Sequence, residues 1–107
     1  PPEAPDGLAA NTVLKTADLA MPGVAEDLVR DRPDVIFHLA AIPSGGSETD
    51  FEAGYRANLD GTRNLLEAIR KTGDAYKPKV IYTSSIAVYG APFPPSIPDD
   101  FVLTPLT

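Results

Sequence analysis

The residues from Asp34 to Ala41 (DVIFHLAA) form an almost continuous apolar run that only His38 interrupts. The run shows no alternation between apolar and polar residues, which predicts a strand that is apolar on both faces. Such strands lie in the middle of parallel sheets, because the connections between parallel strands place helices on each face. This run therefore predicts an α/β fold.

The flanking segments extend this strand into a β-α-β-α-β order. Residues 12–17 (TVLKTA) fit a short strand. Apolar residues at helical spacing over 24–29 predict a helix whose first turn contains Pro22 and which ends at Arg32-Pro33. A second helix is expected over 50–71 and a last strand over 79–83. Crossovers between parallel strands are right-handed, so the fold class is a partial Rossmann-like, doubly wound parallel sheet. It comprises three strands and two helices.

The helix over 50–71 has the clearest pattern. Thr49 at the N-cap and Glu52 three residues later have the spacing of a capping box, after a loop that precedes residue 50. One stripe of the helix is expected to face inward, and it comprises Phe51, Tyr55, Asn58, Thr62, Leu65 and Ile69. The opposite face is charged and is expected to be solvated; it comprises Glu52, Arg56, Asp60, Arg63 and Glu67.

Length, charge and cysteine content limit the classes of protein. With 107 residues the chain is expected to form one folding unit at most. It divides into a loop (1–11), the β-α-β-α-β unit (12–90) and a proline-rich extended surface segment (91–107). The net charge of −6 disfavours a nucleic-acid partner, and no apolar run is long enough to span a membrane. The absence of cysteine excludes disulfides and thiolate metal sites, no metal site is supported, and a cytoplasmic location is expected.

Several polar residues are candidates for a site. Thr83, Ser84 and Ser85 follow the last strand, where ligands of parallel sheets bind; alternatively, their hydroxyls satisfy backbone groups in a turn. Asn58 is a buried amide whose partners are either the backbone or an active-site water. Asp18 and Leu19 follow the first strand and could equally mark the start of a helix, whereas the single histidine, His38, is interpreted as a core residue.

Four motifs follow one another over roughly residues 12–90, in the order Asp18-Leu19, DVIFHLAA, NLDGTRNLLEA from Asn58, and YTSSIAVYG. Together they resemble the extended short-chain dehydrogenase/reductase family, also called the NAD-dependent epimerase/dehydratase family. Within this family, the loops most resemble members that oxidise D-erythronate, a four-carbon sugar acid, at C2 with NAD.

The resemblance implies a role for each candidate. Asp18 and Leu19 would contact the adenine of NAD, and Asn58 would lie near its nicotinamide. The ribose and diphosphate would be lined by Leu39, Ala40, Ala41, Ile42 and Pro43, with Thr83 and Ser84 beside the cofactor. Ser85 would be the catalytic and substrate-binding hydroxyl, bonded to the substrate oxygen while a Tyr acts as base and a Lys lowers the pKa of that Tyr.

Two parts of the family pattern are missing from the sequence. There is no G-x-G-x-x-G, and the residues four positions after the tyrosines are Leu59, Val80, Ile86 and Phe93 rather than lysine. In the family, that Tyr comes about two dozen residues after the Ser. The resemblance therefore implies an internal part of the NAD(P)-binding domain of a larger enzyme, inactive by itself. The choice between NAD and NADP is made in the family at a strand outside this sequence, so NAD is implied by resemblance alone.

The resemblance predicts oxidation of the C2 hydroxyl of a small sugar acid by hydride transfer to NAD. The alternatives are a nucleotide-sugar epimerase or dehydratase of the same family, or a non-catalytic NAD-binding regulator. A dehydratase would be expected to carry Asp-Glu after the catalytic hydroxyl, where this sequence has Ile86-Ala87. The family commonly dimerises through the equivalent of the 50–71 helix, which implies a homodimer.

Overall fold

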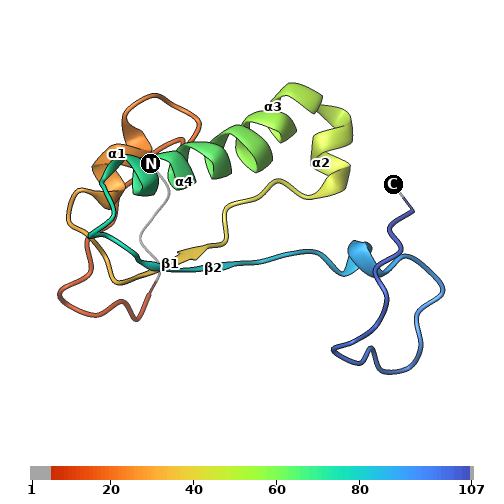
Figure 1. Ribbon diagram of the computed structural model, residues 1–107. Coiled ribbons are helices and arrows are strands. Elements are labelled where there is room, and N and C mark those ends of the chain that lie inside the picture. The colour runs from red at the N-terminus through yellow and green to blue at the C-terminus, as the bar shows by residue number, and fades with distance from the viewer. Residues whose placement is uncertain (1–5, 107) are drawn as a thin grey trace.

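The computed structural model describes residues 6–106, in which two parallel strands lie beneath a layer of helices (Figure 1). The strands are β1 (Val35–His38) and β2 (Lys79–Tyr82), and the register places Val35 opposite Lys79 and His38 opposite Tyr82. Both lie within the predicted ranges 34–41 and 79–83, so these two strand predictions are confirmed.

The helices α1 (Val24–Val29) and α4 (Gly61–Lys71) pack together over one face of the sheet. Between them lies the hydrophobic core, which consists of Ala25, Val29, Leu65, Ala68 and Tyr76. The Tyr76 hydroxyl donates to the carbonyl of Pro33 over 2.9 Å, which ties the turn after α4 to the turn before β1. The core therefore holds α1, α4 and the starts of both strands together.

Between β1 and α4 the chain forms further helical turns: α2 (Ser44–Thr49), α3 (Phe51–Tyr55) and a π-helical turn (Arg56–Asp60) that continues into α4. The loop expected before residue 50 is thus largely the helix α2. The predicted N-cap is also wrong by one residue, because the Asp50 carboxylate accepts the hydrogen bond from the Ala53 amide at 3.0 Å. Thr49 lies at the end of α2, where its hydroxyl donates to the carbonyl of Gly45.

The π-helical turn changes which residues of the predicted stripe face inward. Leu65 is only 4% exposed, as expected, but Phe51 is 66% and Tyr55 51% exposed. A π turn accommodates more residues than an α turn, and each residue of an α-helix advances the side-chain direction by about 100°. The two aromatic residues before the turn are therefore rotated away from the face that Leu65 occupies.

The predicted strand over 12–17 is not present: within residues 6–106 the sheet consists of β1 and β2 alone. An apolar cleft of about 480 Å³ separates Lys15 and Ala17 from β1, so the segment has no neighbour to complete a hydrogen-bonded ladder.

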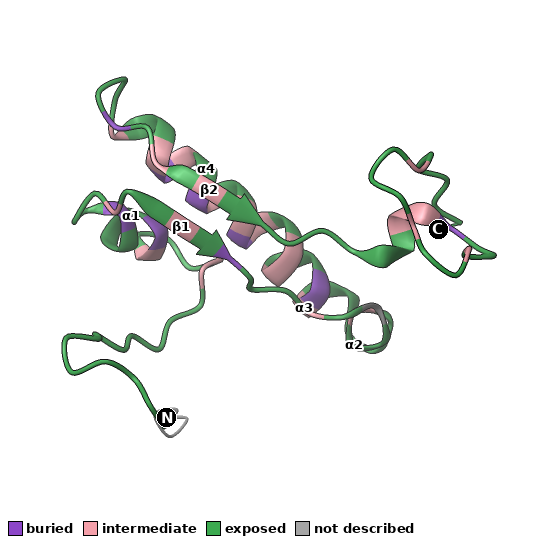
Figure 2. Ribbon diagram, turned by 90° about the horizontal axis from the view of Figure 1, so that it is seen from below, coloured by how far each residue is buried: buried purple, intermediate pink, exposed green. Residues whose placement is uncertain are grey.

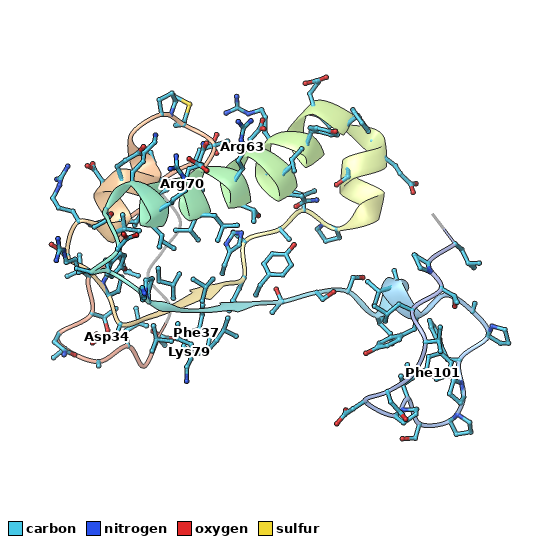
Figure 3. All side chains as sticks on the ribbon, in the orientation of Figure 1. Asp34, Phe37, Arg63, Arg70, Lys79 and Phe101 are labelled. Carbon is cyan, nitrogen blue, oxygen red and sulfur yellow. The ribbon has the colours of Figure 1, made fainter. Side chains whose placement is uncertain are left out.

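Helices also cover only one face of the sheet among the described residues, rather than both. Phe37 and Lys79 point away from the helices (Figure 3), and the outer face of the strands is mostly exposed (Figure 2). Phe37 is 64% exposed, because none of the described segments packs over it.

After β2 the chain continues through a 3₁₀ helix (Ile86–Tyr89) into residues 91–106, which form no helix or strand. This segment returns to the 3₁₀ helix: the Thr104 hydroxyl donates to the carbonyl of Tyr89 over 3.0 Å, and Phe101 packs edge-on against Tyr89. Gly90, with a φ of 71°, lies against the Thr104 carbonyl, where a Cβ would come within 2.2 Å. No helix among residues 6–106 is long and apolar enough to cross a bilayer.

Candidate functional site

A cleft of about 310 Å³ lies where the segment before α1 meets the loop after β1. Five of its lining residues are alanines, so a ligand could approach the backbone closely. The cleft brings together five of the residues predicted to bind a cofactor, although they come from segments about twenty residues apart in the sequence. Its lining residues are Ala17, Asp18, Leu19, Ala20, Ala40, Ala41, Ile42 and Ala57.

Among residues 6–106, Asp18 is the only charged residue that lines this cleft. One carboxylate oxygen accepts a hydrogen bond from the Ala20 amide at 2.9 Å, and the other accepts one from Arg56 Nη2 at 2.7 Å. The Ala20 amide and, after it, the Arg56 guanidinium lower the pKa of Asp18 below its ordinary value. The carboxylate is therefore held ionised at the edge of the cleft.

Asn58 holds the loop after β1. Its Oδ1 accepts from the Ile42 amide at 2.8 Å, and its Nδ2 donates to the Ile42 carbonyl at 2.9 Å and, more weakly, to Ser47 Oγ at 3.5 Å. The backbone, one of the two partners expected for this amide, is thus observed. Asn58 lines a hollow beside α3 rather than the cleft at Asp18, so its contribution to that cleft is the position of Ile42.

His38 is 5% exposed and packs beneath α4, as expected for a core histidine. Its Nε2 lies 2.7 Å from Thr62 Oγ1, and the Thr62 hydroxyl donates to the carbonyl of Asn58. Because a hydroxyl has one proton to donate, the imidazole is the donor in the first bond and Nε2 carries the proton. The end of β1 is thereby tied to the π-helical turn.

Ser85 lies after β2 and is exposed, as are Thr83 and Ser84. Its Oγ accepts a hydrogen bond from the Ala87 amide at 3.2 Å and caps the 3₁₀ helix. The bond uses an oxygen lone pair, so the hydroxyl proton can still be donated to a ligand. The three hydroxyl residues are not among those that line the cleft at Asp18. Beyond β2 the chain runs away from α1 (Figure 1).

The remaining predicted residues lie at the edges of this region, and one functional candidate was missed. Leu39 is 60% exposed and lines the larger apolar cleft, and Pro43 is exposed just before α2. Arg56 is exposed, as predicted for the solvated face, and it also forms an ion pair with Asp18. No local pattern could have indicated this pair, because its members are 38 residues apart in the sequence.

Two curated proteins named D-erythronate dehydrogenase are similar to this chain. The one from Cupriavidus necator is 45% identical over 103 residues, which is 95% of this chain and 31% of that protein. The one from Haemophilus influenzae is 40% identical over 88 residues, covering 82% of this chain and 27% of that protein. The chain thus spans about a third of the length of these relatives.

A solved structure described as the nucleoside-diphosphate-sugar epimerase from Agrobacterium tumefaciens superimposes with a TM-score of 0.80. It is 61% identical in sequence, and the match covers 98% of this chain and 31% of that one. This likeness supports a Rossmann-like α/β fold. The model of the NAD dependent epimerase/dehydratase family matches residues 3–106, and the chain belongs to this family.

Proposed function

We propose that the intact protein is an NAD-dependent dehydrogenase that oxidises the C2 hydroxyl of a small, D-erythronate-like sugar acid. The observation that carries this proposal is the similarity to two D-erythronate dehydrogenases over 95% and 82% of the chain. A cytoplasmic location and the preference for NAD over NADP are parts of the same proposal.

The cleft at Asp18 fits the adenosine end of a dinucleotide. Its alanine lining lets a flat base approach the backbone, and the Asp18 carboxylate can accept a hydrogen bond from a base amino group. Leu39 to Pro43 continue from the cleft along the proposed path of the ribose and diphosphate. NAD bound there would supply the hydride acceptor.

Ser85 is proposed to orient the substrate. Oxidation removes a hydride from C2 and a proton from the hydroxyl on that carbon, and the Ser85 hydroxyl can donate a hydrogen bond to the same oxygen. Its bond with the Ala87 amide fixes the direction of Oγ without using its proton. The resemblance implies that a Tyr-x-x-x-Lys pair removes the substrate proton, and this sequence contains no such pair.

Replacing Ser85 by Ala in the intact protein tests this role. Loss of the hydroxyl is expected to lower kcat by about tenfold or more, equivalent to about 1.4 kcal/mol of activation free energy, while NAD still binds. Steady-state kinetics with D-erythronate and calorimetric titration with NAD measure the two effects. Ser96→Ala, at an exposed serine of the proline-rich segment, is the control and should turn over normally. Unchanged turnover in Ser85→Ala would reject the role.

A nucleotide-sugar epimerase is the second candidate, because the 61% identical solved structure is described as one. D-erythronate and UDP-sugars differ greatly in size and charge, so one substrate panel separates the two candidates. Reduction of NAD with D-erythronate and no conversion of UDP-sugars is the result expected from the first candidate. Conversion of a UDP-sugar without net reduction of NAD would favour the second.

We also propose that the protein is a homodimer that associates through the helical segment 50–71. Large apolar side chains are exposed along this segment: Phe51, Tyr55, Leu59 and Leu66 are between 49% and 66% exposed. Burial of such residues is a common source of dimer stability. Leu66→Glu should shift the intact protein to monomer in sedimentation, and an unchanged mass would contradict this interface.

A further inference from the structure

The guanidinium of Arg56 connects the π-helical turn to the segment before α1. Its Nη2 donates to Asp18 Oδ2 over 2.7 Å and lies 3.8 Å from the sulfur of Met21. The other Asp18 oxygen is held by the Ala20 amide. Each oxygen of the carboxylate therefore has one fixed partner, and each keeps a further lone pair for a ligand.

Stability does not account for this pair. Both side chains are about half exposed, at 49% for Arg56 and 51% for Asp18. Ion pairs between groups of this exposure contribute little to folding, because water screens them and the side chains lose conformational freedom. The pair instead limits the Asp18 carboxylate to one orientation at the edge of the cleft.

The neighbours of Arg56 indicate which feature this orientation serves. Ala57, the next residue, lines the same cleft as Asp18. Asn58 follows and holds Ile42, another lining residue, by two hydrogen bonds. Three successive residues of the π-helical turn thus contact either the cleft or a residue that lines it.

We propose that Arg56 is a positioning residue that orients the Asp18 carboxylate to accept a hydrogen bond from the amino group of an adenine base. The inference rests on the proposed function, because it takes the bound dinucleotide as its ligand. A carboxylate with no proton can only accept hydrogen bonds, so the ligand atom facing it must be a donor. The amino group of adenine is such a donor, and the ribose hydroxyls are the other donors at the adenosine end of a dinucleotide.

Nicotinamide hypoxanthine dinucleotide separates these two donors, because it keeps the ribose hydroxyls and replaces the adenine amino group with an oxygen. The intact wild-type protein is expected to bind NAD at least about tenfold more tightly than this analogue in calorimetric titration, the scale of a hydrogen bond to a charged group. In Arg56→Met the ratio should fall to about threefold or less, and Arg56→Lys should restore part of it.

Two further variants make the result specific. Arg70→Met removes an arginine of the same helical segment that pairs with Glu67 instead, and it should leave the ratio unchanged (Figure 3). Asp18→Ala should abolish the preference, and adding Arg56→Met to it should change nothing more, because the two residues act as one unit.

A preference for NAD that survives in a folded Arg56→Met protein would overturn the inference, and so would a wild-type protein that binds NAD and the analogue equally. If Arg56→Met does not fold, Arg56→Lys decides, and an Arg56→Lys protein with the same ratio as the wild type would overturn the inference. A wild-type protein that binds neither dinucleotide would overturn the proposed function and the inference with it.

Discussion

Asn58 and Ser85 differ in how much of their hydrogen-bonding capacity the fold already uses. The Asn58 amide has both its oxygen and its nitrogen bonded to Ile42, so it acts on the loop after β1. Ser85 uses one lone pair to cap the 3₁₀ helix and keeps its proton. Asn58 is therefore suited to positioning a loop, and Ser85 is suited to contacting a ligand.

The change Asn58→Asp tests the positioning role at the level of one atom. A carboxylate keeps the acceptor for the Ile42 amide but replaces the donor with a negative oxygen facing the Ile42 carbonyl. We expect a loss of about 1–3 kcal/mol in the free energy of unfolding and a raised KM for NAD. Urea denaturation and steady-state kinetics of the intact protein measure both. Asn11→Asp, the same change at an exposed loop residue, is the control, and an equal effect there would contradict the role.

At the scale of elements, α2 and α3 approach closely at Gly54. A Cβ on Gly54 would lie 2.5 Å from Ser47 Oγ and 3.0 Å from Ser47 Cα. The two short helices can pack in this way only if that side chain is absent. Ser47 belongs to the same turn that Asn58 contacts, so the spacing of these helices also affects the loop at Ile42.

Alanine substitutions at two glycines should therefore change the free energy of unfolding in opposite directions. Gly54→Ala must push α2 from α3 and is expected to destabilise the intact protein by about 1–3 kcal/mol. Gly45→Ala lies within α2, where a Cβ would meet nothing within 4 Å, so it should stabilise by up to about 1 kcal/mol through helix propensity. Denaturant midpoints report both, and adding Ser47→Gly should relieve part of the Gly54→Ala loss. If both substitutions changed the stability in the same direction, close packing of α2 against α3 would be contradicted.

Local patterns were sufficient to predict β1 and β2, which are short apolar runs, and α4, in which apolar residues recur at helical spacing. They were insufficient for the π-helical turn, since counting residues along a helix assumes a constant number per turn. They also failed for residues 12–17, where an extended strand depends on a neighbour that sequence alone does not supply. In the candidate site, Asp18 could be found from its motif, whereas the contact of Arg56 depends on how α4 packs against α1.

At the scale of the whole molecule, the described chain buries little of its surface. Its accessible area is 8565 Å², whereas a compact monomer of its mass would expose about 5,700 Å². Its radius of gyration is 16.6 Å, compared with about 13 Å for a compact domain of this length. Figure 2 shows that the outer face of the sheet and the described segments before α1 and after β2 are mostly exposed.

A polypeptide consisting of residues 1–107 alone should therefore show no cooperative thermal unfolding. The core of Ala25, Val29, Leu65, Ala68 and Tyr76 is too small to offset the conformational entropy of ordering the chain. Calorimetry should give a broad, weak signal, and the apolar face should bind a hydrophobic dye. A sharp transition with an enthalpy of about 60–80 kcal/mol, typical of a 100-residue domain, would refute this expectation.

The π-helical turn also makes the site sensitive to the length of the chain. Deleting one residue between Arg56 and Asp60 would let the segment become a regular α-helix, so its backbone hydrogen bonding would survive. The residues before the deletion would, however, rotate by about 100° relative to α4. Arg56 could not then stay paired with Asp18 while Asn58 stays hydrogen-bonded to Ile42. A shorter, more regular helix would therefore be a poorer scaffold for this cleft.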